Sequence, residues 1–245
     1  MNPISAHRGW SSKAPENTLA AFQLALDTSE IESIEFDVQL TKDGIPVVIH
    51  DFTLERTTNG KGLVKEITYE ELRKLDAGSW FSEEFAGEKV PTLEEVFQLI
   101  KGKKKLYLEL KQAGIMYPGL EKKVYDLMDK YDMFSDTTVI SFDHESLKRL
   151  KDMDNTVSTG LIIYGRPTLI MEQLQYTGAS FIGMGYPFIT AGLLTKLLES
   201  GVTIMCAPGD ELQDIQMIMA MDSSIGISTN YPDRALEMRK IKTTE

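Results

Sequence analysis

The hydrophobic positions of the chain follow two alternating patterns. Short stretches that are apolar throughout or at every second residue are typical of β-strands, and longer stretches with apolar residues three or four positions apart are typical of helices. The strand pattern occurs at residues 3–7, 33–38, 45–49, 105–110, 137–141, 157–163, 179–184, 202–206 and 225–228. The helix pattern occurs at residues 15–29, 92–100, 119–131, 144–153, 167–175, 191–200, 211–221 and 232–240. Because strands and helices alternate, we predict an α/β fold in which about eight units close a TIM (β/α)8 barrel, which commonly takes about 250 residues.

An open, doubly wound sheet is the alternative architecture. Charged side chains fall at the ends of the early strands and at Glu109, and Asn230 follows the last strand. A closed ring brings all of these positions to one face, whereas an open sheet gathers its site at a switch point. The barrel is therefore the favoured fold.

The alternation is interrupted after the third predicted strand. Residues 56–62 are rich in turn formers, and residues 76–89 follow no clear period. We predict that residues 51–91 form a small insertion after the second βα region, packed over the catalytic end of the barrel. The insertion is too short and too poor in apolar residues for a core of its own, so we expect residues 1–245 to form a single domain.

Composition narrows the classes of function. The formal net charge of -11 argues against general nucleic-acid binding and against binding to an anionic membrane surface. The single cysteine, Cys206, cannot form an internal disulfide, and the N-terminus shows neither the basic nor the apolar segment of a signal peptide. No apolar run approaches the roughly 20 residues that span a bilayer. We therefore expect a cytoplasmic protein without an integral membrane segment.

Three acidic residues lie on predicted strands. Glu35 and Asp37 are two positions apart and share a face, and Glu109 alternates with leucines on the strand at 105–110. On an exposed strand such carboxylates would be solvated, but every strand of a barrel is central. Inward-pointing carboxylates at close range repel one another and lose hydration, and a divalent cation relieves both problems. Oxygen ligands without a nearby cysteine favour Mg²⁺ or Ca²⁺ over zinc.

Two of the three histidines, His7 and His50, fall at the ends of predicted strands near these carboxylates. A lone histidine is commonly structural, but two histidines beside an acidic cluster suit proton transfer near neutral pH. Arg8 and Lys111 are the cations nearest to the cluster in the sequence or on its strand face, and they either pair with the carboxylates or bind phosphate oxygens. The third histidine, His144, lies at a predicted helix start, and we assign it no role.

These residues belong to an ordered set of motifs that covers nearly the whole chain. The set consists of His7-Arg8-Gly9, Pro15-Glu16-Asn17-Thr18-Leu19, Glu35-Phe36-Asp37-Val38, Thr41-Lys42-Asp43-Gly44, Val47-Val48-Ile49-His50-Asp51, Arg56-Thr57-Thr58, Pro91-Thr92-Leu93-Glu94, Glu109-Leu110-Lys111, Ser141-Phe142 and Thr229-Asn230-Tyr231-Pro232-Asp233. Each motif alone is a weak signal, but the ordered set is strong. In this set the chain resembles the glycerophosphodiester phosphodiesterase family.

The resemblance implies a metal-dependent hydrolase that cleaves a small-molecule glycerophosphodiester, such as a deacylated phospholipid, to an alcohol and sn-glycerol 3-phosphate. It implies three groups of site residues: the metal ligands Glu35, Asp37 and Glu109, the acid–base pair His7 and His50, and the phosphate-binding cations Arg8 and Lys111. The resemblance does not distinguish the acid from the base. Glu16 and Asn17 match the family motif as well, and at a predicted helix start we expect them to orient the other site residues.

One departure from the family lies near the seventh strand. The family usually carries a Trp-Thr-Val-Asn-like run there, and this chain has Cys206-Ala207-Pro208-Gly209. We therefore expect the aromatic wall beside the substrate to be missing at Cys206, and Trp80 of the insertion is a candidate replacement.

Two further functions stay open. A lysophospholipase D-like activity on a substrate that keeps an acyl chain would need an apolar groove near Phe81, Phe85 and Cys206. A catalytically silent phosphate-binding protein is the other alternative. The complete set of seven polar site residues weighs against it, because a silent relative would be expected to lose a ligand or a histidine.

Overall fold

The structure is a computed structural model that describes residues 1–244, with side chains as far as residue 241. Eight parallel strands of the described chain pair in a ring, which closes because β1 pairs with both β2 and β9. These strands are β1 (Ile4–His7), β2 (Ser33–Leu40), β4 (Lys105–Leu110), β5 (Thr137–Ser141), β6 (Thr159–Ile163), β7 (Phe181–Met184), β8 (Thr203–Cys206) and β9 (Gly226–Thr229). The prediction of a TIM (β/α)8 barrel is confirmed, and the open sheet is excluded.

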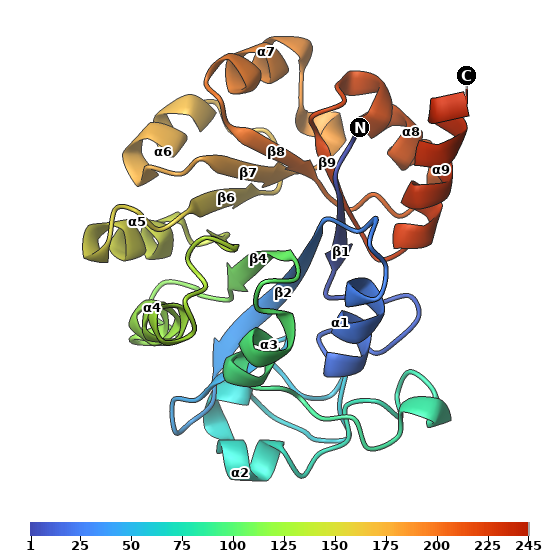
Figure 1. Cartoon of the computed structure of the whole chain (residues 1–245). Helices are drawn as coiled ribbons and strands as arrows, with labels where there is room; N and C mark the ends of the chain where they lie inside the picture. Colours follow the sequence, from blue (N-terminus) through green and yellow to red (C-terminus); the bar gives the residue numbers. More distant parts are fainter. Residues whose placement is uncertain (245) are drawn as a thin grey trace.

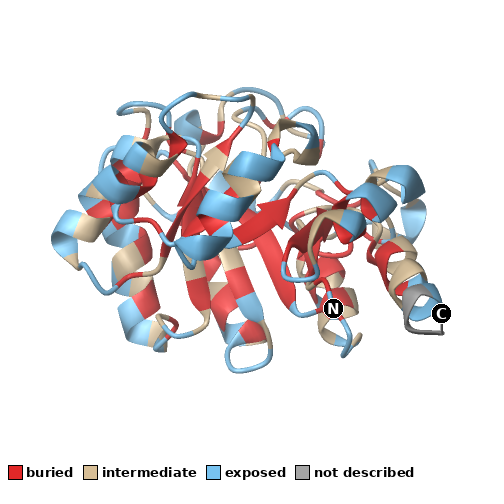
Figure 2. Cartoon of the chain, turned by 90° about the horizontal axis from the view of Figure 1, so that it is seen from above, coloured by how far each residue is buried: buried red, intermediate tan, exposed pale blue. Residues whose placement is uncertain are grey.

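Helices surround this ring, as Figure 1 shows. They are α1 (Leu19–Leu26), α3 (Leu93–Ile100), α4 (Leu120–Tyr131), α5 (His144–Met153), α6 (Ile170–Thr177), α7 (Ala191–Glu199), α8 (Leu212–Met221) and α9 (Pro232–Thr244), with a short 3₁₀ turn η3 (Tyr186–Phe188) after β7. Buried residues concentrate on the strands and on the helix faces turned toward them (Figure 2). None of the helices formed by the described residues is long and apolar enough to cross a bilayer.

Alternation along the strands separates two apolar environments. Side chains such as Phe36, Val38 and Leu108 face outward into the main core beneath the helices. The alternate positions face the inside of the barrel, where Tyr107 packs with a smaller cluster that includes Phe181. The register pairs His7 with Glu35 and Asp37 with Glu109 on neighbouring strands. Because all eight strands are parallel, their carboxyl ends meet at one face, where the sites of such barrels are built.

The first helix begins later than the sequence pattern predicts. Helix α1 starts at Leu19, where the Thr18 side chain accepts a hydrogen bond from the backbone N–H of Ala21. Asn17 has a φ of 58°, a left-handed conformation that a helix cannot contain. The expectation that Pro15 opens the helix is therefore wrong, and Glu16 and Asn17 lie in the loop before it.

The segment after β2 departs from the barrel pattern. Strand β3 (Pro46–Val48) pairs antiparallel with β2, and the insertion that follows contains η1 (Val64–Glu66), α2 (Tyr69–Leu72) and η2 (Glu83–Phe85). A separate apolar cluster joins Val47 of β3 and the adjacent Ile49 to Leu54, Val64 and Leu72 of the insertion. The insertion thus shares a small apolar cluster with β3, and its assignment to a single domain with the barrel stays a prediction. Its placement over the catalytic end stays a prediction.

Candidate active site

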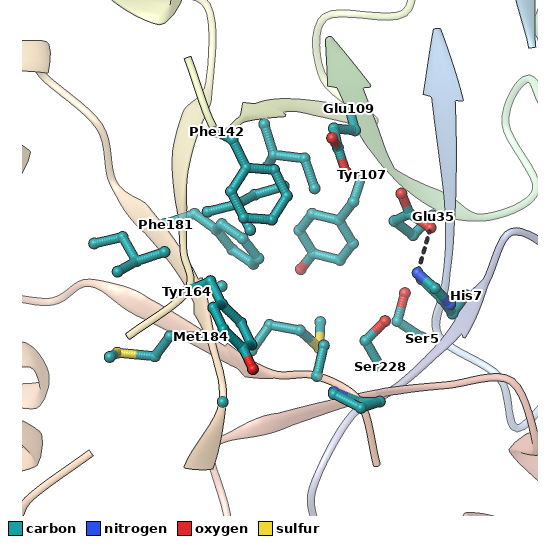
Figure 3. A pocket seen from close by; sticks show the side chains of 18 of the residues that line it. Ser5, His7, Glu35, Tyr107, Glu109, Phe142, Tyr164, Phe181, Met184 and Ser228 are labelled. Carbon is teal, nitrogen blue, oxygen red and sulfur yellow. Dashed lines mark ion pairs between the residues drawn. The ribbon is translucent and has the colours of Figure 1, made fainter. Parts of the chain in front are cut away.

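A cavity of about 310 Å³ opens among the strand ends. One half of its wall is polar and carries His7, Arg8, Glu35, His50 and Glu109. The other half is apolar and is formed by β5 to β8 and the loops that follow these strands. Figure 3 shows the two halves facing each other across the cavity. The structure thus brings residues predicted on or at the ends of four separate strands to one place.

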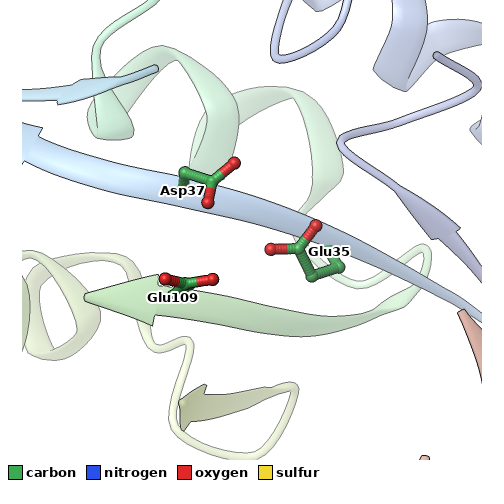
Figure 4. Close-up of side chains that lie close together, drawn as sticks. All are labelled: Glu35, Asp37 and Glu109. Carbon is green, nitrogen blue, oxygen red and sulfur yellow. The ribbon is translucent and has the colours of Figure 1, made fainter. Parts of the chain in front are cut away.

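Three carboxylates form a buried cluster at the polar end. Glu35 and Asp37 extend from β2 and Glu109 from the adjacent β4 (Figure 4). Each offers an oxygen within 4.8 Å of the others, and all three residues are buried. Burial, followed by the charges of its two neighbours, raises the pKa of Glu35 well above its ordinary value. Burial and Asp37 raise the pKa of Glu109 to about 7, against the opposing charge of Lys111.

Asp37 remains ionised because cations and an amide surround it. Burial alone would raise the pKa of Asp37, but Lys111, Arg8 and His50 lower it to about 2. Asn17 contributes a hydrogen bond of 2.8 Å from Nδ2 to Oδ2. This contact is compatible with the orienting role expected of Asn17, which stays a prediction. Asp37 is therefore the readily ionised member of the cluster, whereas the pKa values of Glu35 and Glu109 are raised.

Arg8 and Lys111 are both ion-paired with the cluster. Lys111 Nζ lies 2.8 Å from Glu109 Oε1 and 3.5 Å from Asp37 Oδ1. Arg8 Nη1 donates to Glu16 Oε1 at 2.9 Å, and its Nε lies 3.4 Å from Asp37 Oδ2. That Nε is buried and makes no hydrogen bond to the described residues. The predicted cations thus lie beside the carboxylates, and Glu16 holds Arg8 in position.

A hydrogen-bonded chain orients His7. Asn230 Nδ2 donates to Asp210 Oδ2 at 2.6 Å, so its Oδ1 faces His7 Nδ1 at 2.8 Å. Ser11 Oγ donates to the same amide oxygen. His7 Nδ1 must therefore carry the proton, which leaves Nε2 as the free lone pair, 3.7 Å from Glu35 Oε2. Asp210 had no motif or spacing that marked it, because its partner is twenty residues away on another loop.

A second chain orients His50. His50 Nδ1 donates to Asp51 Oδ1 at 2.6 Å. Arg56 of the insertion donates to Asp51 through Nε and Nη2, and to Glu16 through Nη1 and Nη2. The family motif included Arg56, but only the structure gives it this position. One guanidinium therefore connects the carboxylate behind His50 to the carboxylate behind Arg8.

The surroundings of both histidines lower their pKa values below the ordinary value. Burial lowers the pKa of His7, and Arg8 adds to the effect against the Asn230 hydrogen bond. Burial also lowers the pKa of His50, with Arg8 and Lys111 acting in the same direction against Asp37 and Asp51. A histidine that exchanges protons near neutral pH suits either role in general acid–base catalysis. The third histidine, His144, contacts the Ile162 carbonyl at 3.1 Å and lies outside the cavity wall.

The sequence of the chain matches one known family over most of its length. The profile of the glycerophosphoryl diester phosphodiesterase family matches residues 7–207. The chain belongs to this family. A glycerophosphodiester phosphodiesterase from Caldanaerobacter subterraneus is 49% identical over 160 residues, which are 65% of either chain. One from Bacillus altitudinis is 36% identical over 98% of this chain and 99% of its own. The chain is thus an enzyme of the phosphoric diester hydrolase class.

Solved structures of the family share the barrel. A phosphodiesterase from Oleispira antarctica, solved in complex with the product sn-glycerol-3-phosphate, superposes with a TM-score of 0.90 at 27% identity, covering 98% of this chain and 97% of that one. The glycerophosphodiester phosphodiesterase from Agrobacterium tumefaciens gives a TM-score of 0.82 at 31% identity, covering 97% and 100%. The glycerophosphodiester hydrolases are therefore the chain's relatives in both sequence and fold.

From the sequence we expect an aromatic wall of the cavity to be missing at Cys206, but the side chain at this position does not face the cavity. Cys206 is fully buried in the outer core, where burial raises the pKa of its thiol to about 12. Its neighbour Ala207 faces the cavity instead. Trp80 donates its Nε1–H to the Ala77 carbonyl and does not line the cavity, so it is not the replacement. Assigning the missing wall to Cys206 is thus wrong by one residue.

Aromatic side chains line the cavity at other positions. They are Tyr107, Phe142, Tyr164 and Phe181. By contrast, Phe81 and Phe85 pack against each other in the insertion at a centroid distance of 5.7 Å, away from the cavity wall. An apolar groove exists beside Met205, Ala207 and Pro208, next to Cys206 as the lysophospholipase D-like alternative required, but Phe81 and Phe85 do not line it. Sequence reasoning assigned none of these four aromatics to the cavity, although Phe142 belongs to the Ser141-Phe142 motif, because they come from separate strands and loops.

Proposed function

We propose that the chain hydrolyses glycerophosphodiesters to an alcohol and sn-glycerol 3-phosphate with the help of a divalent cation. The observation that carries this proposal is the buried cluster of three carboxylates between two oriented histidines on one cavity. Membership of the family supports it, as does the product-bound relative from Oleispira antarctica. A cytoplasmic location and the absence of nucleic-acid partners stay predictions.

The donor set of the cluster fits a hard cation. Glu35, Asp37 and Glu109 offer only oxygen atoms, which suit Mg²⁺ or Ca²⁺. Without a cation, burial and then the charges of the neighbouring carboxylates raise the pKa values of Glu35 and Glu109, so both carboxyls hold a proton more tightly than an exposed glutamate does. When bound, the cation would supply positive charge that polarises the phosphate. The three carboxylates are thus the proposed ligands.

The two histidines differ in the partner behind the ring. His50 is backed by the ionised Asp51, which stabilises an imidazolium, whereas His7 is backed by the neutral amide of Asn230. We assign to His50 the proton given to the departing alcohol oxygen, and to His7 Nε2 the proton taken from the attacking oxygen. The attacking oxygen bonds to phosphorus as the P–O bond to the alcohol breaks. His7 then releases its proton to solvent and His50 takes one up from solvent, which restores both rings for the next turnover.

Arg8 and Lys111 are the proposed phosphate-binding cations. The Arg8 Nε–H lies 3.4 Å from Asp37 Oδ2 and makes no hydrogen bond to the described residues, so we assign it a phosphate oxygen as acceptor. Both side chains are held beside the cluster by ion pairs before substrate arrives, which reduces the reorganisation needed in the transition state. Two serines, Ser5 and Ser228, also line this cavity. The buried Ser5 hydroxyl has no hydrogen-bond partner among the described residues.

The test is an assay of glycerophosphocholine and glycerophosphoethanolamine with and without EDTA. Formation of sn-glycerol 3-phosphate that stops in EDTA and returns with Mg²⁺ or Ca²⁺ supports the proposal. Asp37→Ala is expected to abolish turnover while the barrel stays folded. Hydrolysis that continues in excess chelator, or in Asp37→Ala, contradicts the metal-dependent function. Binding of phosphate without any turnover would favour the catalytically silent alternative.

A further inference from the structure

The cavity has an apolar half that the proposed chemistry does not use. We call it the apolar arm, and it is lined by Ile140, Ile162, Tyr164, Phe181, Met184 and Met205. The same cavity is lined by His7, Glu35 and Glu109, so the arm begins where the phosphorus of a substrate would lie. Figure 3 shows Phe181, Tyr164 and Met184 across the cavity from His7 and Glu35. A group attached to the phosphate and directed away from the polar half would therefore enter the arm.

The chemistry of the arm favours a hydrocarbon. None of the side chains that line it is ionised, so a charged head group would find no counter-ion there. The two facing aromatics, Tyr107 and Phe181, lie with their centroids 4.7 Å apart and partly cover each other's faces. Those faces are thus less available to a quaternary ammonium, which aromatic cages bind face-on. Isoleucine and methionine side chains complete the wall, and methionine adapts its shape to flexible apolar ligands.

The apolar lining continues to the surface. Tyr164 follows β6 and is 88% exposed, and Phe142 follows β5 and is 53% exposed. Both also line the cavity, so each ring has one side toward the interior and one toward solvent. Large exposed aromatics at the mouth of an apolar cavity gain free energy when a ligand covers them. A hydrocarbon chain of a ligand that extends beyond the interior of the barrel would still contact apolar side chains at the mouth of the cavity.

We propose that the apolar arm binds a hydrocarbon chain of the substrate, so that phosphodiesters with an alkyl or acyl chain are preferred over glycerophosphocholine. This inference rests on the proposed phosphodiesterase function. The hydrocarbon chain can belong to either of two parts of the substrate. It is part of the leaving alcohol in a glycerophospho-n-alkanol, and it is attached to the glycerol in a 1-acyl lysophospholipid. Both present the same hydrocarbon to the arm, and two substrate series separate them.

The first experiment compares chain lengths. We would measure kcat/KM for glycerophospho-n-alkanols and for 1-acyl glycerophosphocholines with chains of increasing length, all below their micelle concentrations, beside glycerophosphocholine. Each methylene that enters the arm is expected to raise kcat/KM about 3- to 4-fold until the arm is full. The series that rises identifies the source of the chain. A flat response in both series with normal hydrolysis of glycerophosphocholine overturns this inference alone, whereas no hydrolysis of any diester overturns the proposed function.

The second experiment blocks the arm. Gly183 lines the cavity, and a Cβ there would meet Phe181 at 3.5 Å, an ordinary contact, so Gly183→Leu is expected to fold and occupy the arm. The readout is the ratio of kcat/KM for the best long-chain diester to that for glycerophosphocholine, which we expect to fall at least about 10-fold. Gly183→Ala is the smaller variant should the leucine prevent folding. An unchanged ratio in a folded Gly183 variant overturns the inference.

Removing the aromatic at the mouth provides a matched comparison. Tyr164→Ser removes a ring that lines the cavity, and Tyr176→Ser removes one that is 59% exposed on α6 and does not line it. We expect the long-chain ratio to fall about 3- to 10-fold in Tyr164→Ser and to be unchanged in Tyr176→Ser. Equal ratios in both variants contradict a role for the mouth of the arm.

Discussion

Arg56 donates two hydrogen bonds to the carboxylate of Asp51, 2.6 Å from Nε to Oδ2 and 2.9 Å from Nη2 to Oδ1. Asp51 in turn accepts the Nδ1 hydrogen bond of His50. Arg56 thus connects the insertion to the site without itself having to contact the substrate. Its role is to position Asp51 and, through Asp51, the imidazole of His50.

We expect Arg56→Ala to lower kcat about 10- to 100-fold with little change in KM, because displacements of about 1 Å in a catalytic group can cost that much. Steady-state kinetics on glycerophosphocholine measure this. Arg56→Lys should recover only part of the loss, since a lysine cannot form the two-pronged contact. Arg73→Ala, an exposed arginine just after α2, is the control. A loss confined to KM, or equal losses in the two alanine variants, would contradict a positioning role.

The acid and base assignments give a second prediction. A leaving group such as p-nitrophenol departs without a proton, so a variant that lacks the general acid is rescued on it. We expect His50→Ala to lose about 10²- to 10⁴-fold in kcat on a natural diester but far less on a p-nitrophenyl diester. His7→Ala should lose activity on both substrates. Rescue of His7→Ala instead of His50→Ala would reverse the assignment.

Asn230→Ala tests the orientation of His7 separately. Without the amide, the proton of His7 is no longer held on Nδ1, and a smaller loss than that of His7→Ala is expected with unchanged folding.

The elements and the grouping of the main candidate site residues at one cavity were predictable because their signals are local. Glu35 and Asp37 share a face through the two-residue period of a strand, and parallel strands bring their ends to one face of a barrel. The contacts of Asp210 were not predictable, because they form between loops that only the closed ring brings together. The start of α1 was misplaced because Pro15 suits a first helical turn, while the left-handed Asn17 serves Asp37 instead.

The charge cluster leads to a prediction about stability. The folded-state pKa of Glu109 is about 7, above its ordinary value of 4.5, so the folded metal-free protein holds this proton more tightly than the unfolded chain. The contribution of this proton to the free energy of unfolding is therefore fully present below the ordinary pKa of 4.5. It is lost as the pH rises through the folded-state pKa of about 7. Glu109→Gln mimics the protonated carboxyl and should stabilise the metal-free protein at pH 8 by about 1–3 kcal/mol.

Urea denaturation in EDTA at pH 8 and at pH 5 measures this difference. At pH 5 wild-type Glu109 is largely protonated in the folded state, so the two proteins should differ much less there. Saturating Mg²⁺ or Ca²⁺ should reverse the order at pH 8, because the variant lacks a proposed ligand. A destabilised Glu109→Gln protein at pH 8 in EDTA would show that the ion pair with Lys111 outweighs the repulsion.

Cys206 and Ala207 provide the last prediction, since a shift of one residue along a strand turns the side chain to the opposite face. Cys206 is fully buried beneath the helices, and Ala207 lines the cavity beside Met205 and Pro208. A tryptophan at Cys206 would overpack the outer core, so Cys206→Trp is expected to cost about 3 kcal/mol or more. A tryptophan at Ala207 would instead extend into the cavity, so Ala207→Trp should retain most of its stability.

The two variants should therefore separate stability from specificity. We expect Ala207→Trp to change the ratio of kcat/KM between glycerophosphocholine and a diester without glycerol hydroxyls by about 10-fold or more. Cys206→Trp should leave that ratio unchanged per folded molecule, with a lowered midpoint of urea unfolding. The decisive comparison is this ratio together with the unfolding midpoint for both proteins. A stable Cys206→Trp protein with altered specificity would mean that the thiol position, and not Ala207, faces the substrate.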